Sequence, residues 1–298
     1  MHRIGFVGAS GLMGHGIAKN LRARGYPLAL TVHRNRDRVA DLLAAGATEV
    51  ADAAALAREA DIVFICVTGS PQVEAVVSGP NGLLAGARRG LTIIDCSTSE
   101  PESTAMLRER CDALGVTFVD APLARSPEAA ELGTLNVMVG ASGATYDALL
   151  PVLTCFAETV LHAGEPGAGH VLKLLNNFVA QAVCTATAEA FGVGQRAGID
   201  LRQLVAVISA GPVNSGVFQA MAKTLDGDLA GLRFGLDNAR KDVRYYTHLA
   251  ESLNMPSVVG EAVHQSLALA SALGYGTKFV PSLVEAQEQL GGVKIVPR

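Results

Sequence analysis

Several classes of protein are excluded by what this sequence lacks. Its cysteines are few and scattered, and none of them belongs to a CxxC pair. An odd number of five cysteines without such pairs is typical of reduced thiols that pack as small hydrophobic groups. The seven histidines form no cluster with the spacing of metal ligands, so we expect no metal site.

Long apolar runs and an excess of positive charge are also absent. No stretch of about 18 uninterrupted apolar residues occurs, which argues against a transmembrane helix. Met1–Arg3 leads directly into an apolar run, without the three regions of a signal peptide, so we expect a cytoplasmic protein. The net charge of -4 gives no electrostatic reason to expect nucleic acid or an acidic membrane surface as a partner.

The first half of the chain contains a regular alternation of strand and helix patterns. The 298 residues, 49% hydrophobic and 17% charged, suffice for two domains with sizeable cores. The alternation continues to about Gly164, which predicts an α/β fold with a Rossmann-type doubly wound parallel sheet. The expected strands are Ile4–Val7, Leu28–Val32, Asp61–Val67, Thr92–Cys96, Val116–Asp120 and Leu135–Val139.

A glycine-rich turn follows the first expected strand and precedes a helical pattern. Its glycines, Gly8, Gly11 and Gly14, would let backbone N–H groups approach a pyrophosphate at the start of the helix. The spacing is GxxGxxG, one residue longer than the GxGxxG of dinucleotide-binding folds. The alternative is a tight turn without a ligand. We expect a cofactor contact from Gly8, Ser10, Gly11, Leu12 and Met13.

The second expected strand ends in basic residues rather than in an acid. NAD-specific sites place an acidic residue there for the ribose hydroxyls. Here the chain reads His33-Arg34-Asn35-Arg36. Guanidinium groups suit a 2′-phosphate, which favours NADP over NAD. The alternative is that these side chains are only solvated charges.

Polar residues also follow later strands. Ser97 and Thr98 come at the end of an expected strand, where open α/β sheets bind ligands, although turn hydroxyls that bond the local backbone explain them equally well. Ser99 with Glu102 matches a capping box for the next helix. Arg125 lies in a loop just past another strand, where it is either an anion contact or a plain surface arginine.

A long helix is expected from about residue 168 to 197, and every periodic segment after it is helical. We therefore predict a dinucleotide-binding domain over residues 1–164 and an all-helical domain over 165–298 that share this helix. His170, Lys173 and Asn177 lie on one face of it, with Asn176 beside them. Taken alone, Lys173 could simply be a lysine whose stem lies along an apolar helix.

In order and spacing these motifs resemble the β-hydroxyacid dehydrogenase family, which includes 3-hydroxyisobutyrate dehydrogenase and the tartronate, glyoxylate and succinate semialdehyde reductases. The resemblance covers nearly the whole chain. The motifs that carry it are Leu12-Met13-Gly14, Ala18-Lys19-Asn20-Leu21, Asp95-Cys96-Ser97-Thr98 with Pro101, Asp120-Ala121-Pro122, Gly133-Thr134-Leu135, Val139-Gly140, Gly164, Gly167, Gly169, Lys173, Asn176-Asn177 and Lys241-Asp242.

The resemblance implies a role for each matching residue. Lys173 matches the family's general acid and base, and Asn177 with Asn176 matches the amide that orients the substrate oxygen. Thr98 matches the threonine near the nicotinamide, where it would contact both cofactor and substrate. Lys241 matches a lysine that closes over the bound cofactor and substrate. We also assign Val67, the last residue of the third expected strand, and Thr68, which follows it, to the cofactor.

One departure from the family concerns the substrate loop. Leu123-Ala124-Arg125-Ser126 stands where most members have Val-Ser-Gly-Gly, a loop that cradles the substrate carboxylate. A similar arginine in the sulfolactaldehyde reductase branch meets a sulfonate, so we expect Arg125, with Ala124 and Ser126, to bind an anionic head group. Ala180 stands where that branch carries a serine, so the sulfonate itself is not carried over.

The expected function is hydride transfer between NAD(P) and a small anionic β-hydroxyacid or its aldehyde. Two alternatives stay open: an imine reductase-like enzyme, and a regulatory protein that binds NADP without catalysis. Imine reductases share the two-domain build but generally lack the lysine, so Lys173 favours carbonyl chemistry. Family members pair through the helical domain, which implies a homodimer or homotetramer.

Overall fold

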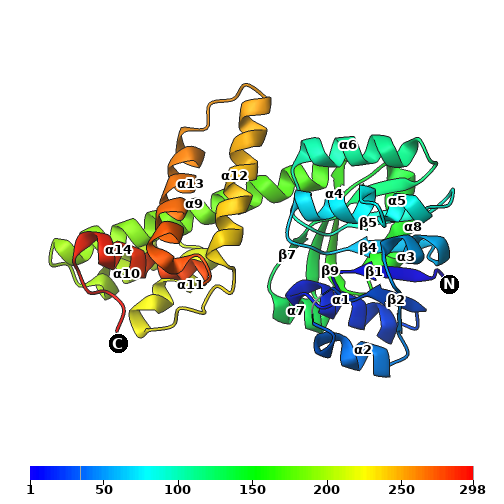
Figure 1. The fold of residues 1–298 in the computed structure, drawn as a ribbon. Coiled ribbons are helices and arrows are strands. Elements are labelled where there is room, and N and C mark those ends of the chain that lie inside the picture. Colours follow the sequence, from blue (N-terminus) through cyan, green and yellow to red (C-terminus); the bar gives the residue numbers. More distant parts are fainter. Residues whose placement is uncertain (34, 298) are drawn as a thin grey trace. The chain divides into compact units, whose positions relative to one another are not determined.

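The computed structural model describes residues 1–33 and 35–297. The chain forms two compact units, Met1–Lys173 and Leu174–Arg298, which divide inside the long helix α9 (Ala168–Arg196; Figure 1). Our expected domain boundary between residues 164 and 165 stays a prediction.

The first unit is built on a nine-stranded sheet. Its order is β3-β2-β1-β4-β5-β6-β8-β7, with β9 beside β8. Neighbouring strands from β3 to β6 are parallel, whereas β8 runs antiparallel to β6 and β7. The strands are β1 Ile4–Val7, β2 Leu28–Thr31, β3 Thr48–Glu49, β4 Ile62–Ile65, β5 Thr92–Asp95, β6 Thr117–Asp120, β7 Leu123–Ala124, β8 Leu135–Gly140 and β9 Ala157–Gly164.

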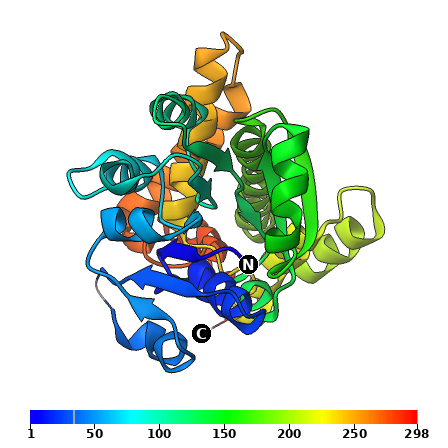
Figure 2. The same cartoon turned by 90° about the vertical axis from the view of Figure 1, so that its right-hand side faces the viewer.

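Helices cover both faces of this sheet (Figures 1 and 2). Alternate residues of one strand serve opposite faces: Phe64 packs with Phe6 and Phe156, whereas Val63 and Ile65 belong to a separate core. Strands buried on both faces are typical of doubly wound folds, so the predicted fold class is confirmed. The helices are α1 Leu12–Ala23, α2 Ala40–Ala44, α3 Ala53–Glu59, α4 Ser70–Ser78, α5 Leu83–Gly86, α6 Pro101–Asp112, α7 Pro127–Leu132 and α8 Gly143–Leu153.

Three strands escaped the sequence analysis. Strands β3 and β7 have two residues each, which is too short for a recognisable pattern. Strand β9 pairs with β8 along one side, and most of its residues, including Glu158 and His162, are exposed or only partly buried. A strand with so little buried surface lacks the apolar run by which the central strands were recognised.

The second unit is helical, as expected. After α9 come α10 Leu201–Ala210, α11 Gly216–Ala222, α12 Leu236–Ser252, α13 Val258–Ala270 and α14 Leu283–Gly291. Phe191, Met221, Leu236 and Leu267 lie in its single core. Within the described part of the chain, no helix combines the length and the apolar character needed to cross a membrane.

Several helix ends differ from the sequence-based expectation. The capping box of Ser99 and Glu102 is wrong: α6 begins at Pro101 after Glu100, and the Ser99 hydroxyl donates to Asp95 Oδ2 over 2.9 Å. Asp200 caps α10 by accepting the N–H of Arg202. Helix α11 begins at Gly216, because the Ser215 hydroxyl accepts the N–H of Phe218 and so caps it there.

Candidate active site

The glycine turn after β1 is shaped by close contact with the chain itself. Gly8 has φ of +96°, and a Cβ on it would lie 2.1 Å from the carbonyl oxygen of Cys66. A Cβ on Gly14 would lie 2.2 Å from the carbonyl oxygen of Gly8. Only glycine fits at these two positions, so the turn can pass tightly from β1 into α1.

Helix α1 begins directly at this turn. Gly11 is its N-cap residue and supplies no side-chain cap, so the first N–H groups of the helix depend on other partners. The N-terminus of a helix also carries partial positive charge, which favours a phosphate. The turn and the 12-residue helix therefore fit the pyrophosphate of a dinucleotide.

The carboxyl ends of five parallel strands meet at the edge where this turn lies. In the sheet register Val7 pairs with Thr31 and with Ile65, which in turn pairs with Asp95, and Asp95 with Asp120. The residues that follow these strand ends include most of the predicted cofactor contacts: Gly8, Ser10, His33, Asn35, Val67, Thr68 and Thr98. Leu12 is exposed and Met13 partly buried at the start of α1. Arg34 lies outside the described residues.

Hydrogen bonds shape the loop that carries Thr98. The Ser97 hydroxyl accepts the N–H of Val67 over 3.0 Å, and the N–H of Ser97 donates to Asp95 Oδ1 over 2.9 Å. The Ser97 hydroxyl thus bonds the backbone after the neighbouring strand β4, and not the backbone of its own turn. Cys66 beside the loop is no nucleophile, because burial raises the pKa of its thiol to about 12.

The expected substrate loop is tied to the sheet. Arg125 has φ of +82°, the left-handed region that favours glycine, so the sequence departs from the family where the backbone suits glycine. Its Nη1 donates to the carbonyl of Thr134 over 2.8 Å and to Glu158 Oε2 over 2.5 Å. Ala124 lies in β7, and the Ser126 hydroxyl accepts the N–H of Ala129 as the N-cap of α7.

The first turn of α9 lies against the ends of β5 and β6. Asp120 accepts the N–H of Gly167 over 2.7 Å and that of His170 over 3.0 Å. The His170 ring is fully buried: Nδ1 is 2.7 Å from the Thr104 hydroxyl, and Nε2 is 3.6 Å from Asp95 Oδ2. Lys173, one turn further along α9, is partly buried.

In the second unit Asn177 and Lys241 share a partner that the sequence analysis did not select. Asn177 Nδ2 donates to Asp242 Oδ2, and Lys241 Nζ donates to Asp242 Oδ1, both over 2.6 Å. Lys241 also lies over the Tyr245 ring, 4.6 Å from its centroid. Because a carboxylate only accepts, Asp242 fixes which end of the Asn177 amide faces it. The signal was the Lys241-Asp242 dipeptide, of which only the lysine was chosen.

The Asn177 amide also meets its neighbour on the helix. Asn176 Nδ2 donates to Asn177 Oδ1 over 3.2 Å. Asn177 is buried and Asn176 exposed. Asp95, Asp120 and His170 were likewise missed as site residues. The sequence does not show which partners a buried aspartate at a strand end, or a histidine on a helix, will have.

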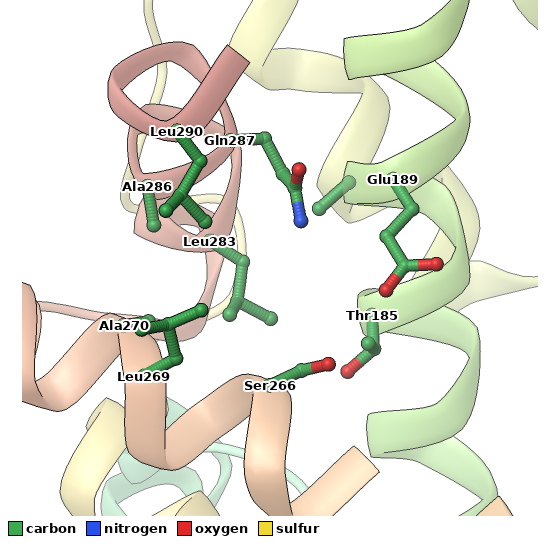
Figure 3. A pocket seen from close by; sticks show the side chains of 10 residues that line it. Thr185, Glu189, Ser266, Leu269, Ala270, Leu283, Ala286, Gln287 and Leu290 are labelled. Carbon is green, nitrogen blue, oxygen red and sulfur yellow. The ribbon is translucent and has the colours of Figure 1, made fainter. Parts of the chain in front are cut away.

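A cavity of about 100 Å³ in the second unit lies apart from these predicted residues (Figure 3). Helices α9, α13 and α14 supply its walls, and Figure 3 shows the Thr185 and Ser266 hydroxyls pointing toward each other at one side of it. None of the predicted site residues lines it.

Comparison with known proteins agrees with the fold and the glycine turn, which define an NAD(P)-binding oxidoreductase. Residues 3–164 match the model of the NAD-binding domain of 6-phosphogluconate dehydrogenase. Residues 167–285 match the NAD-binding model of NADP-dependent 3-hydroxyisobutyrate dehydrogenase. The chain belongs to the β-hydroxyacid dehydrogenase family, as the sequence motifs predicted.

Individual relatives are similar over almost their full length. The chain is 30% identical to 2-(hydroxymethyl)glutarate dehydrogenase of Eubacterium barkeri, covering 98% of this chain and 97% of the other. It is also 30% identical to 3-sulfolactaldehyde reductase of Escherichia coli, covering 96% and 95%. A solved 3-hydroxyisobutyrate dehydrogenase from Salmonella typhimurium has a TM-score of 0.82 at 28% identity, covering 96% and 99%.

Solved imine reductases share the fold alone. The enzyme from Myxococcus stipitatus has a TM-score of 0.65 at 17% identity. Membership of the family thus supports the expected nicotinamide cofactor, but it does not distinguish NADP from NAD.

Proposed function

We propose that this protein is an NAD(P)-dependent reductase or dehydrogenase of a small anionic β-hydroxyacid and its aldehyde, with Lys173 as general acid and base. The observation that carries the proposal is the spacing on α9, where Lys173 and Asn177 are one turn apart and face the same way. A bound nicotinamide cofactor would supply or accept the hydride.

The side chains would divide the remaining work. In reduction the Lys173 ammonium gives a proton to the oxygen of the former carbonyl, and in oxidation the neutral amine takes it from the hydroxyl. The Asn177 amide orients that oxygen, and Asp242 keeps the amide from turning over. Lys241 would close over the bound cofactor and substrate.

Arg125 is our candidate for the anionic head group, together with the neighbouring Ala124 and Ser126. Both hydrogen bonds of its guanidinium use Nη1, and a guanidinium has five N–H donors, so the same side chain can hold an anion. The names of two relatives support an anionic substrate, since hydroxymethylglutarate and sulfolactaldehyde both carry acidic groups.

For the cofactor we propose NADP in preference to NAD. The five residues directly after β2, Val32 to Arg36, include no carboxylate that could bind the ribose hydroxyls, and His33 and Asn35 are exposed there. A homo-oligomer is also part of the proposal. Large exposed apolar side chains of the second unit, including Val193, Val207 and Val258, support it.

The test is an absorbance assay that crosses NADPH and NADH with glyoxylate, succinate semialdehyde, tartronate semialdehyde and sulfolactaldehyde. We expect turnover of one aldehyde, and faster turnover with NADPH. Lys173→Ala should lower kcat by about 10²–10⁴-fold and leave the cofactor Kd unchanged. Lys223→Ala, which removes an exposed lysine, is the control and should change neither. Unchanged turnover in Lys173→Ala would remove the central claim.

A further inference from the structure

Two buried aspartates stand side by side at the carboxyl ends of β5 and β6. Asp95 and Asp120 are paired in the sheet register, so their backbones are about 4.8 Å apart. Both side chains are almost completely buried. Two neighbouring carboxylates in such a place need strong compensation from hydrogen-bond donors.

Asp120 is compensated by backbone N–H groups at the start of α9. The N–H groups of Gly167 and His170 bond its two oxygens, at the end of the helix that carries partial positive charge. Asp95 receives one N–H from Ser97 and one hydroxyl from Ser99. The third polar group that faces it is the His170 ring, whose Nε2 lies 3.6 Å from Oδ2.

The proton on His170 can be located from its surroundings. Nε2 is fully buried and has no hydrogen-bond partner within 3.5 Å among the described residues. If Nε2 carried no proton, its lone pair would face the Asp95 carboxylate at 3.6 Å. A proton on Nε2 turns this repulsion into attraction. The Thr104 hydroxyl, which lies 3.1 Å from the carbonyl oxygen of Glu100, then either turns its one proton to Nδ1 or accepts a proton from Nδ1.

We propose that Asp95 and His170 are positioning residues that join the cofactor loop to the helix of Lys173. The inference rests on the proposed role of Lys173. On one side, Asp95 holds the Ser97–Ser99 loop that carries Thr98. On the other side, it attracts the Nε2 proton of His170, three residues before Lys173 on the same helix. A single carboxylate thereby sets the direction of the catalytic lysine relative to the loop at the nicotinamide.

The glycines around Asp120 show how closely this end of α9 is held. A Cβ on Gly169 would lie 2.4 Å from the carbonyl oxygen of Met138, and a Cβ on Gly140 would lie 2.5 Å from both Asp120 oxygens. The backbone of α9 is thus fixed by Asp120, while the rotation of its first turn depends on the His170 ring. Misplacing a reacting group by about 1 Å can cost about a hundredfold in rate.

The first measurement is independent of activity. Long-range proton–nitrogen spectra of the histidine rings, assigned by comparison with His170→Gln, report which nitrogen of His170 carries a proton. We expect a protonated Nε2 at neutral pH. An unprotonated Nε2 would overturn the proposal, whether or not Lys173 proves essential.

The second measurement separates positioning from stability. His170→Leu removes the donor, and His170→Gln keeps an amide donor of similar reach. We expect kcat of the Leu variant to fall by about ten- to a hundredfold, with KM and the cofactor Kd within about twofold of the parent. The Gln variant should recover most of the loss. A folded Leu variant with full kcat, or a Gln variant no better than Leu, would contradict the inference.

Asp95→Asn provides a second route in case His170→Leu fails to fold. Asparagine keeps the shape and an acceptor for the N–H of Ser97 but loses the charge that faces His170. We expect a similar loss of kcat, and adding His170→Gln to Asp95→Asn should lower kcat little further, because the loss of the charge has already broken the interaction. If the losses in kcat of the two single variants multiplied in the double variant, Asp95 and His170 would act independently, which would contradict the inference. Lys173→Ala, measured alongside, separates failure of this inference from failure of the proposed function.

Discussion

At the scale of single residues, Arg125 combines an unfavourable backbone conformation with a surface ion pair. A non-glycine residue in the left-handed region costs about 1–3 kcal/mol. The pair with Glu158 is about half exposed on both sides and contributes at most about 1 kcal/mol. We therefore expect Arg125→Gly to be as stable as the parent, or slightly more stable, in urea unfolding.

The same variant should nevertheless bind substrate worse. Loss of the guanidinium should raise KM for an anionic aldehyde about tenfold, the size of a charge-assisted hydrogen bond. Glu158→Gln is the matched control, because it releases Arg125 without removing it, and its KM should stay equal or fall. If KM of Arg125→Gly is unchanged, Arg125 serves only to tie its loop to β9.

Cofactor choice is also decided at single residues. Replacing Arg34 with alanine should weaken NADPH about tenfold and leave NADH nearly unchanged, because only NADPH has the 2′-phosphate. The measurement is the Kd of each cofactor by fluorescence titration. Arg38→Ala changes an exposed arginine four positions further on; it is the control and should spare both. Equal losses for the two cofactors would point to a general charge effect.

At the scale of elements, the start of α9 depends on close contact with the sheet. The Cβ of Gly169→Ala would clash with the backbone of β8 and with Asp120, which should destabilise the protein by about 1–3 kcal/mol. Gly143→Ala is the matched control at the start of α8. Its Cβ meets nothing within 4 Å, and alanine favours a helix by about 1 kcal/mol. Urea unfolding measures the free energy of unfolding of both variants. Equal values would contradict the close packing of α9 against the sheet.

His15 connects helix α1 to α2 and α7. Its Nε2 is 3.0 Å from Asp41 and its Nδ1 is 2.6 Å from Glu131, which also pairs with Lys19. Burial lowers the pKa of His15, but the hydrogen bonds and charges of Asp41 and Glu131 outweigh it and raise the pKa overall. A raised pKa means that folding favours the charged ring.

The stability from His15 is therefore fully present below the ordinary histidine pKa of about 6.5 and is lost as pH rises through the raised value. We expect the difference in free energy of unfolding between the parent and His15→Gln to shrink from pH 6 to pH 9. Urea unfolding across this range measures it. A difference that grows with pH would mean that the ring is neutral in the folded protein.

Sequence predicted these elements best where burial leaves a pattern. The buried strand at Phe64 and the face shared by Lys173 and Asn177 follow from periodicity alone. Asp242, His170 and Asp95 could not be selected, because their importance lies in partners 65, 66 and 4 residues away. The capping error at Ser99 has the same origin, since its hydroxyl serves Asp95 instead of the next helix.

At the scale of the whole molecule, each unit has its own core, yet α9 belongs to both. Helix formation is cooperative, so a helix is weakened along its length when one part of it unfolds. The first turn of α9 is held in the unit that carries the glycine turn, and unfolding of that unit would therefore weaken the part of α9 that belongs to the second unit. We therefore expect the two units to unfold in one transition. Calorimetry should show a single peak without cofactor.

Calorimetry with bound cofactor distinguishes one shared unfolding transition from two separate ones. A ligand at 100 times its Kd stabilises the folded state by about 2.7 kcal/mol, so NADP bound at the glycine turn should move the whole peak upward. If the units unfolded separately, only the transition of the first unit would move and a second would stay in place. Two peaks, of which one ignores NADP, would show that α9 joins the units without coupling their stability.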